Sequence, residues 1–182
     1  MTRQASSSGC SLEDILVPIE PTRAAHAADF TLAQGLLSLA KTLTAEPGAV
    51  VGHLVETAMR LTGADSAGIS LLDPLSGDHF KWVATAGGFA RYLHGTLPRH
   101  FSPCGAVFDQ GRALMMRDPV RLYPYIGELH LPVRMVLLVP FSQDGVPIGT
   151  LWIVRHSSDA AFTQDDLSAS TALAEFLGVE AP

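Results

Sequence analysis

The 182 residues carry 47% hydrophobic and 16% charged side chains, with a formal net charge of −6 at pH 7. So apolar a composition excludes an intrinsically disordered chain, and the length suits one ordinary domain. Without a run of basic residues, the sequence favours neither nucleic-acid nor anionic-membrane binding. The longest apolar run, Met135–Phe141, is too short to cross a bilayer, the N-terminus lacks the hydrophobic stretch of a signal peptide, and two cysteines cannot make a disulfide framework. We therefore expect a single-domain, cytoplasmic protein that does not contact the membrane.

The first 28 residues are typical of an arm outside the folded domain. They contain a serine-rich stretch, two prolines and an alanine-rich run, a composition common in linkers and surface straps. We expect residues 1–28 to be flexible at the start or to form a strap. The docking side chains would be apolar: Leu12, Ile15, Leu16 and Ile19.

Two helices are predicted next. Leucines recur between residues 32 and 43 at spacings that place them on one side of a helix, and Asp29 is a candidate N-cap. In the second helix Pro47 suits the first position and Gly63 the end, with one apolar stripe between them.

The pattern then becomes typical of β-strands. Apolar residues alternate in Ala67–Leu71 and Phe80–Ala84, and the turn-forming cluster between them predicts an antiparallel hairpin. Met135–Phe141 is apolar at every position, which indicates a central strand covered on both faces. Gln143–Gly145 predicts a tight turn into a last strand, Val146–His156.

Single residues refine this last part of the chain. Pro140 should lie at a strand end or a bulge, and Gly149 should mark a bulge or a close backbone approach. Thr163 and Asp166 form a capping box that starts a final helix, and Gly178 is expected to end it. The order of elements predicts an α+β fold on an antiparallel sheet.

Gly87–Leu131, which we call the middle segment, is too long for a passive connection and is expected to carry binding function. Alternation along the last strand places two sets of side chains on opposite faces. One set is Val146, Ile148, Thr150, Trp152, Val154 and His156, and the other is Leu151, Ile153 and Arg155. One face must meet the helices and the other the middle segment, and the sequence leaves both assignments open.

Several strings of the sequence are shared with one family of sensory domains. They are ADSAGISLL (64–72), LPR (97–99), FSPCG (101–105), LVPF (138–141), GVPIGTLW (145–152) and FTQDDL (162–167). Together they resemble GAF domains, which are related to PAS domains, over residues 29–178, leaving 179–182 as a tail. FSPCG is similar to a bacterial subgroup found alone or in sensor histidine kinases. The resemblance implies a central antiparallel sheet of five to six strands, with the terminal helices on one face and a long pocket-forming segment on the other.

The resemblance also implies a non-enzymatic sensory or regulatory role in bacterial signal transduction. GAF domains bind ligands of several classes, so the expected ligand is a small molecule of unidentified type. Binding would shift the packing of the terminal helices and so reach a partner, such as a histidine kinase. GAF domains commonly pair through those helices, so a homodimer is expected.

Aromatic, basic and thiol side chains of the strands and the middle segment are candidates for the pocket lining. They are Trp82, Tyr92, Arg99, His100, Cys104, Arg117, Tyr123, Tyr125, His130, Arg134, Trp152 and His156. The same residue types also describe a filled core.

Cys104 is the candidate for thiol chemistry. Ser102 can cap a short helix that has Pro103 at its first position and ends at Gly111. The helix dipole would lower the pKa of a thiol in the first turn, which predicts a redox sensor. The alternative is a small packed residue under a tight loop. Free-methionine sulfoxide reductases are also GAF proteins, but only Cys104 resembles one of their several cysteines, so no catalytic residue is assigned.

His130 lies in a stretch similar to haem-binding GAF domains of oxygen and redox sensor kinases. The resemblance would make it the proximal haem ligand, and a solvent-facing loop histidine is the alternative. Residues 123–130 contain no cysteine for a bilin, and the Asn-Lys pair of cyclic-nucleotide GAF domains is missing. The histidines have no metal-ligand spacing, so no metal site is expected.

Overall fold

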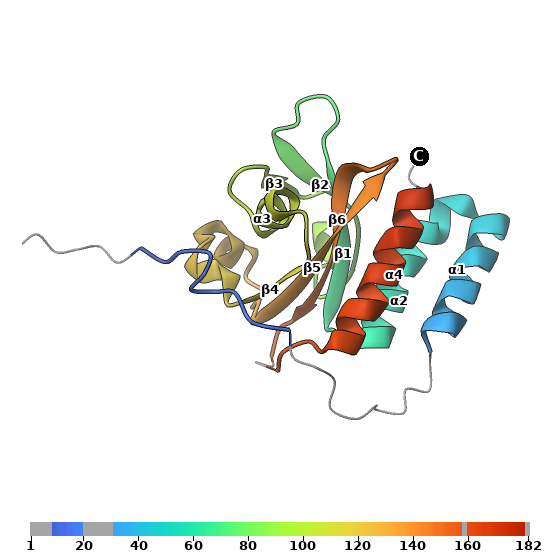
Figure 1. The fold of residues 1–182 in the computed structure, drawn as a ribbon, viewed down its shortest axis with the longest axis horizontal. Coiled ribbons are helices and arrows are strands. Elements are labelled where there is room, and N and C mark those ends of the chain that lie inside the picture. Colours follow the sequence, from blue (N-terminus) through green and yellow to red (C-terminus); the bar gives the residue numbers. More distant parts are fainter. Residues whose placement is uncertain (1–8, 20–30, 158–159, 181–182) are drawn as a thin grey trace, which may run out of the picture.

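The computed structural model describes residues 9–19, 31–157 and 160–180, and a six-stranded antiparallel sheet runs through the middle of it (Figure 1). The strand order is β3-β2-β1-β6-β5-β4. The strands are β1 (Ser66–Leu72), β2 (His79–Gly87), β3 (Thr96–Pro98), β4 (Leu114–Arg117), β5 (Met135–Gln143) and β6 (Val146–Arg155). The helices are α1 (Leu32–Ala45), α2 (Val50–Thr62), α3 (Pro103–Gln110) and α4 (Gln164–Glu180). The α+β prediction is confirmed.

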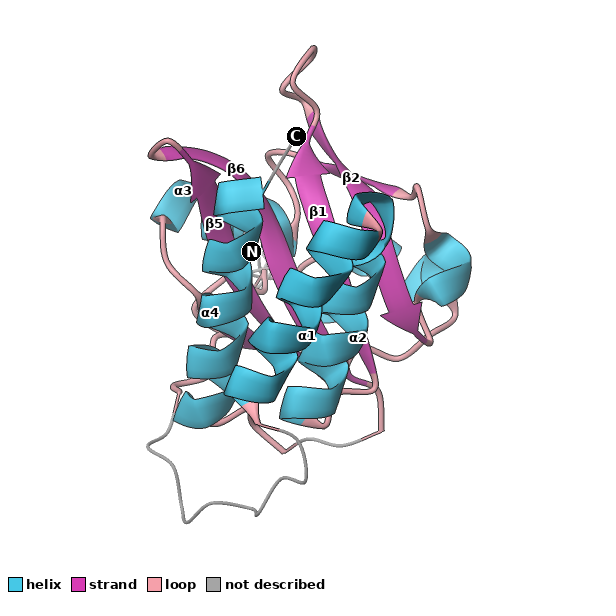
Figure 2. Ribbon diagram, turned by 90° about the vertical axis from the view of Figure 1, so that its right-hand side faces the viewer, coloured by secondary structure: helices cyan, strands magenta, loops and turns pink. Residues whose placement is uncertain are grey.

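The two faces of the sheet are covered by different parts of the chain. Figure 2 shows α1, α2 and α4 side by side on one face. Both α2 and α4 pack against strands, whereas α1 packs on α2. The opposite face carries the middle segment, with α3 and several short 3-10 turns. None of the helices in the described part of the chain is long and apolar enough to cross a membrane.

This arrangement gives the protein two apolar cores that share the strands. Neighbouring residues on a strand point to opposite faces. Leu151 and Ile153 therefore pack in the helix-side core, and Trp152 and Val154 in the core under the middle segment. The structure thereby decides the question that the sequence left open: the face of the last strand that carries Trp152 meets the middle segment, and the face that carries Ile153 meets the helices. Ile148 departs from the alternation, because it packs against the helix-side core.

Part of the N-terminal arm extends the sheet at its β4 edge. The Val17 N–H donates to the Met115 carbonyl at 2.9 Å, and the Arg117 N–H donates to the Ile15 carbonyl at 2.8 Å. Ile15 is buried, and the other three docking side chains predicted from the sequence are half-buried or pack against a core. Strand β4 is thus covered, as an exposed edge would invite pairing with other chains.

The helix ends follow the sequence only in part. Pro47, predicted at the first position of the second helix, begins a 3-10 turn, Pro47–Ala49, and α2 starts after it at Val50. Thr31, rather than Asp29, is the N-cap of α1: its hydroxyl accepts from the Gln34 N–H, and the Gln34 side chain accepts from the Thr31 N–H. Asp29 lies outside the described residues. Gly63 ends α2 in the left-handed conformation, as predicted.

The hairpin β5–β6 explains the Pro and Gly positions within it. Pro140 lies opposite Thr150 of β6, beyond the last β4–β5 pair and beside a bulge between Phe141 and Ser142. No neighbouring strand therefore needs an N–H from Pro140. At Gly149 a Cβ would lie 2.4 Å from the Ser70 carbonyl oxygen, which confirms the predicted close approach.

The predicted end of the last helix at Gly178 is wrong, because α4 continues to Glu180. A Cβ at Gly178 would lie 2.3 Å from the Ser142 carbonyl oxygen. The glycine therefore allows α4 to pass close to the end of β5, and its role is packing rather than termination.

We predict that Gly178→Ala destabilises the protein. Ala normally favours a helix over Gly, but here its methyl group must displace backbone, which costs about 1–3 kcal/mol. The matched control is Gly52→Ala in α2, where a Cβ meets nothing within 4 Å and should stabilise by about 0.5–1 kcal/mol. Urea unfolding measures both, and equal stabilisation by the two substitutions would contradict the packing role.

Candidate functional site

A cavity of about 50 Å³ lies between the sheet and the middle segment. Its walls come from β2, β3, β5, β6, α3 and the connecting loops and 3-10 turns, and their side chains are almost entirely apolar. The lining residues are Trp82, Phe89, Leu97, Pro103, Cys104, Pro119, Ile126, Leu129, Val133, Val136, Leu138, Trp152 and Val154. Of the twelve pocket residues expected from the sequence, the structure brings Trp82, Cys104 and Trp152 to this cavity.

Three aromatic rings fill much of the space between the two layers. Phe89 contacts Trp82 and Trp152 edge-on, with ring centroids 5.5 and 5.1 Å apart, and the two indoles are 5.6 Å apart. Each of the three residues is at most 5% exposed. Ligand pockets typically measure about 300–1,000 Å³, so the space that these rings leave free is much smaller than a typical ligand pocket.

Small residues on β1 make room for the Trp152 indole. Ser66, Gly68 and Ser70 alternate on the face of β1 that meets the middle segment, since Ala67 and Ile69 belong to the helix-side core. A Cβ at Gly68 would lie 2.1 Å from Trp152 Cζ2. The indole therefore lies directly against the β1 backbone.

The buried polar groups of the site gather around Ser70, with one exception. The Trp152 Nε1–H donates to the Ser70 hydroxyl at 3.0 Å, and the Cys104 thiol lies 3.5 Å from the same oxygen. The exception is the Nε1–H of Trp82, which is buried and has no acceptor among the described residues. It is one of five buried side-chain polar atoms without a hydrogen-bond partner among the described residues, and it is the one carried by a ring that lines the cavity.

Cys104 is in the predicted short helix but not in the predicted electrostatic state. Ser102 caps α3 by accepting from the Gly105 N–H at 3.0 Å, Pro103 is first, and Gly111 ends the helix. The thiol is nevertheless completely buried, and this burial raises its pKa despite the hydroxyls of Ser70 and Thr150 beside it. Desolvation thus outweighs the hydrogen bonds that lower the pKa of this thiol, and the geometry favours a packed thiol over a reactive one.

A chain of hydrogen bonds holds Phe89 in place. The Phe89 N–H donates to the Ser66 hydroxyl at 3.3 Å, which lies 2.6 Å from His156 Nε2, while His156 Nδ1 contacts the Pro132 carbonyl. The His156 ring also stacks on Phe89, with centroids 5.7 Å apart. His156 therefore supports the cavity wall from behind without lining it.

The tyrosines predicted for the pocket brace the middle segment. The Tyr92 hydroxyl donates to the Leu129 carbonyl, and the Tyr125 hydroxyl donates to the Phe101 carbonyl at 3.0 Å. Tyr123 is buried among apolar side chains, and this burial raises its pKa to about 12. These residues shape the segment that covers the cavity, but they lie outside its wall.

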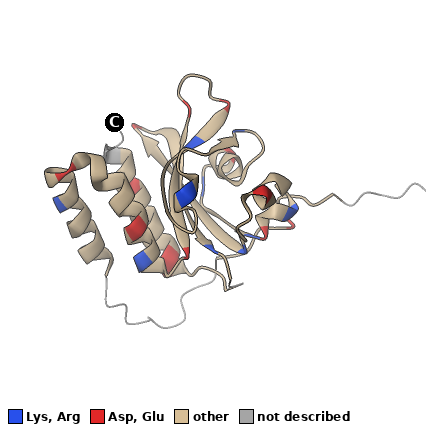
Figure 3. Cartoon of the chain, turned by 180° about the vertical axis from the view of Figure 1, so that it is seen from behind, with Lys and Arg blue, Asp and Glu red and all other residues tan. Residues whose placement is uncertain are grey.

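The predicted basic residues do not face the cavity. Arg99 pairs with Asp109 at 2.5 Å and lies over the Phe108 ring, and Arg134 pairs with Asp118 at 3.0 Å. Arg117 is half-buried on the β4 edge strand. In the view of Figure 3, Lys and Arg are interspersed with Asp and Glu.

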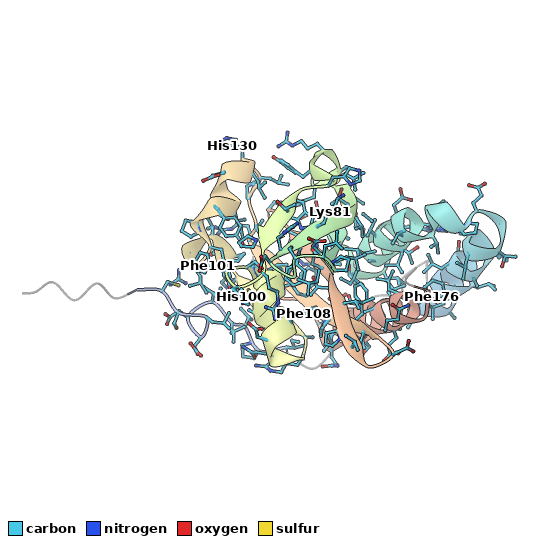
Figure 4. The ribbon with its side chains drawn as sticks, turned by 90° about the horizontal axis from the view of Figure 1, so that it is seen from above. Lys81, His100, Phe101, Phe108, His130 and Phe176 are labelled. Carbon is cyan, nitrogen blue, oxygen red and sulfur yellow. The ribbon has the colours of Figure 1, made fainter. Side chains whose placement is uncertain are left out.

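The predicted haem ligand is also outside the site. His130 is exposed, follows the 3-10 turn Pro124–Leu129 and points away from the body of the protein in Figure 4. His100 is exposed as well. The described residues contain no cluster of His, Cys, Asp or Glu able to hold a metal. With His130 outside and a cavity of about 50 Å³, the residues present do not fit haem.

A sheet with three helices on one face and a cavity-forming segment on the other is the architecture implied by the sequence strings. Residues 44–179 match the family model of the GAF domain. The chain belongs to the GAF domain family. The match leaves out the docked arm and nearly all of α1. No curated protein matches the chain in sequence.

Solved structures of GAF domains share this fold. The GAF domain of a phosphoenolpyruvate-protein phosphotransferase from Coxiella burnetii superposes with a TM-score of 0.72 at 18% identity, covering 82% of this chain and 91% of that one. Free methionine-R-sulfoxide reductase from Neisseria meningitidis superposes with a TM-score of 0.67 at 19% identity, covering 90% of this chain and 94% of that one. The GAF-B domain of DevS from Mycobacterium smegmatis superposes with a TM-score of 0.60 at 21% identity, covering 74% of this chain and 92% of that one. GAF is a small-molecule-binding sensory fold, and one of these neighbours is an enzyme.

Sequence reasoning missed Ser66, Ser70 and Phe89. A signal for the serines was present, because small residues alternate in Ser66–Ser70 where a half-buried strand would carry large ones. Phe89 follows two glycines, a place where backbone freedom and a large apolar side chain coincide.

We predict that Ser66→Ala loosens the Phe89 loop. The substitution leaves the Phe89 N–H and His156 Nε2 without their partner, which costs about 1–3 kcal/mol. Native-state hydrogen exchange at the Phe89 amide should accelerate, whereas the Trp82 amide, bonded to the Gly95 carbonyl at 2.9 Å, should respond less. Ser168→Ala, at an exposed position of α4, is the control, with an expected change within about 0.5 kcal/mol.

We predict that the Cys104 thiol reacts slowly with iodoacetamide at neutral pH. Because burial raises its pKa, the thiolate is scarce and shielded until the protein opens. Mass spectrometry of Cys10→Ala protein follows Cys104 alone, and addition of urea should accelerate labelling. If the folded protein is labelled rapidly, and the labelling rate plotted against pH has its midpoint below the ordinary thiol pKa near 8.5, a redox sensor would be supported instead.

Proposed function

We propose that this GAF domain is a non-enzymatic sensor that binds a small molecule in the cavity between the sheet and the middle segment. The observation that carries the proposal is the cavity itself: apolar walls, three aromatic rings and one buried indole N–H without an acceptor. Few precisely placed polar groups in an apolar concavity are typical of small-molecule sites.

Sensing requires the cavity to be connected to an output surface, and the strands supply that connection. On β5, Val136 and Leu138 line the cavity while Leu137 packs in the helix-side core. On β6, Trp152 lines the cavity while Ile153 packs in the helix-side core. A ligand that moves Trp152 therefore moves the wall against which α2 and α4 pack, and it shifts the population of helix arrangements.

The terminal helices are the proposed output surface. Helix α1 is the outermost layer in Figure 1, and it exposes Leu37. We propose that α1 and α4 carry the signal to a second copy of the chain or to a signalling partner such as a histidine kinase.

Of the alternatives, neither haem sensing nor thiol sensing has a supporting observation. His130 is exposed, and Cys104 is buried with a raised pKa.

We predict that filling the cavity weakens ligand binding without harming the fold. Val136→Ile keeps a β-branched residue on β5 and adds one methylene, worth about 0.8 kcal/mol when buried. A metabolite library is screened by thermal shift and native mass spectrometry, and a true ligand should bind Val136→Ile at least about tenfold more weakly, the equivalent of about 1.4 kcal/mol. Hydrogen exchange in α4 should change with ligand in the wild type only.

Val146→Ile is the matched control, because Val146 is 62% exposed on the neighbouring strand and should leave binding unchanged. A ligand that binds both variants equally well binds outside the cavity and contradicts the proposal. A Soret band in an absorption spectrum recorded from 300 to 750 nm on freshly purified protein would support a haem sensor instead.

A further inference from the structure

We infer that the ligand is a small, neutral, aromatic molecule with one hydrogen-bond acceptor, and that it takes the place of the Phe89 ring. The inference rests on the proposed function and names the ligand class of the same cavity. Three features of the site define that class: the absence of charge in its wall, the aromatic ring that now fills it, and the unpaired donor of Trp82.

The wall excludes a charged ligand. None of the side chains lining the cavity is ionised at neutral pH, since they are apolar apart from the indoles and the buried Cys104 thiol. The nearby arginines Arg99 and Arg134 are engaged by Asp109 and Asp118. A carboxylate or phosphate would lose its hydration without gaining a counter-charge, which is strongly unfavourable.

Phe89 shows which shape the site accepts. Its ring meets Trp82 and Trp152 edge-on and lies parallel to the His156 ring, an arrangement that aromatic pairs prefer. The remaining 50 Å³ is far below the roughly 150 Å³ of a cavity known to take benzene. An aromatic ligand can enter only if Phe89 leaves, and its ring would then make the contacts that Phe89 makes now.

The chain around Phe89 allows this movement. Phe89 lies between β2 and a 3-10 turn, Ala90–Tyr92, outside any long element. Gly87, with φ +68°, and Gly88 precede it, and Gly95 follows. Phe89 itself is held by two hydrogen bonds: its N–H donates to the Ser66 hydroxyl, and its carbonyl accepts from the Tyr92 N–H. The rest of the loop is held at the Ala90 carbonyl by the Thr85 hydroxyl, at the Tyr92 hydroxyl by the Leu129 carbonyl, and at His94 and Gly95 by the Trp82 backbone. Few bonds must break for the ring to swing out.

Trp82 specifies the acceptor. Its Nε1–H is buried without a partner, whereas the Trp152 Nε1–H is already bonded to Ser70. Inside the cavity, the side chains that accompany Trp82 are apolar apart from the Trp152 indole and the Cys104 thiol, so a water molecule there would lack the two to four polar partners that it needs. A carbonyl, ether or ring nitrogen on the ligand would satisfy the indole N–H and be favoured over an isostere without one.

The test uses the two tryptophans as reporters. ¹⁵N-labelled protein has two indole N–H signals, and Trp82→Phe identifies them. Three probes of similar shape are titrated: acetophenone, α-methylstyrene, in which CH₂ replaces the oxygen, and benzoate, which adds charge. We expect acetophenone to move the Trp82 proton downfield and the bonded Trp152 proton less. It should bind about 2- to 10-fold more tightly than α-methylstyrene, and benzoate should not bind.

Variants of Phe89 test the displacement. Phe89→Ala should bind acetophenone at least tenfold more tightly than the wild type, because no ring has to leave. Since this truncation removes a large buried side chain, Phe89→Leu is examined with it and should show a smaller gain in a more stable protein. Phe101→Leu, at a half-exposed ring outside the cavity, should leave the affinity unchanged.

Benzoate binding as tightly as acetophenone would overturn the inference, as would Phe89 variants that bind no better than the wild type. So would an unchanged preference for acetophenone in Trp82→Phe. If a charged metabolite binds more weakly to Val136→Ile than to the wild type and the neutral probes do not bind, the inferred ligand class is wrong and the proposed function stands. If no molecule shows Val136-sensitive binding, both are wrong.

Discussion

The contact between the Trp152 indole and Gly68 determines the rest of the site. Because Gly68 has no Cβ, the indole lies against the β1 backbone, and its N–H reaches the Ser70 hydroxyl. The same hydroxyl is the neighbour of the Cys104 thiol, so α3 is fixed to the sheet at its first turn. The other side of the indole meets Phe89 and Trp82. A larger residue at 68 would displace Trp152 and, through it, every wall of the cavity.

The sheet acts as a shared wall between two apolar cores, and this makes the site suitable for sensing. A strand transmits displacement well because its side chains are bonded to one rigid backbone and point alternately to both faces. Trp152 touches the cavity and Ile153 the helices. Protein interiors are packed closely, so a side chain on one face cannot move far without a response on the other. The loop that carries Phe89, by contrast, lies outside the strands and α-helices and can change without unfolding the sheet.

The fold could be predicted from the sequence more completely than the site, and particular residues show why. Local patterns were enough to predict much of the fold: the alternation in Ala67–Leu71, the turn at Gln143–Gly145 and the Ser102–Gly111 helix all depend on neighbours in sequence. The site depends on distances between segments. Gly178 has the sequence signature of a helix end, but its role depends on the Ser142 carbonyl, 36 positions earlier.

Cys104 illustrates two opposing effects that a sequence cannot weigh. The helix N-terminus is visible in the sequence and would lower the thiol pKa. Burial is set by Ser70, Thr150 and the cavity wall, which come from distant strands, and it raises the pKa. The same holds for His130 and Arg99, whose sequence context gives no direction for the side chain. Family resemblance identified the region of the pocket, and only packing determined which residues line it.

A cavity closed by its own side chain has a consequence for the strength of binding. The closed state keeps the Phe89 ring in contact with two indoles and an imidazole, which is more favourable than an open apolar hole of the same volume. A ligand must therefore compete with that ring, and its apparent affinity is reduced by the fraction of protein in the open state. The same competition supplies the signal, because occupancy by a ligand necessarily expels Phe89 and frees the Ser66 hydroxyl and the His156 ring from it. Weak apparent affinity and a large structural response are thus two results of one contact.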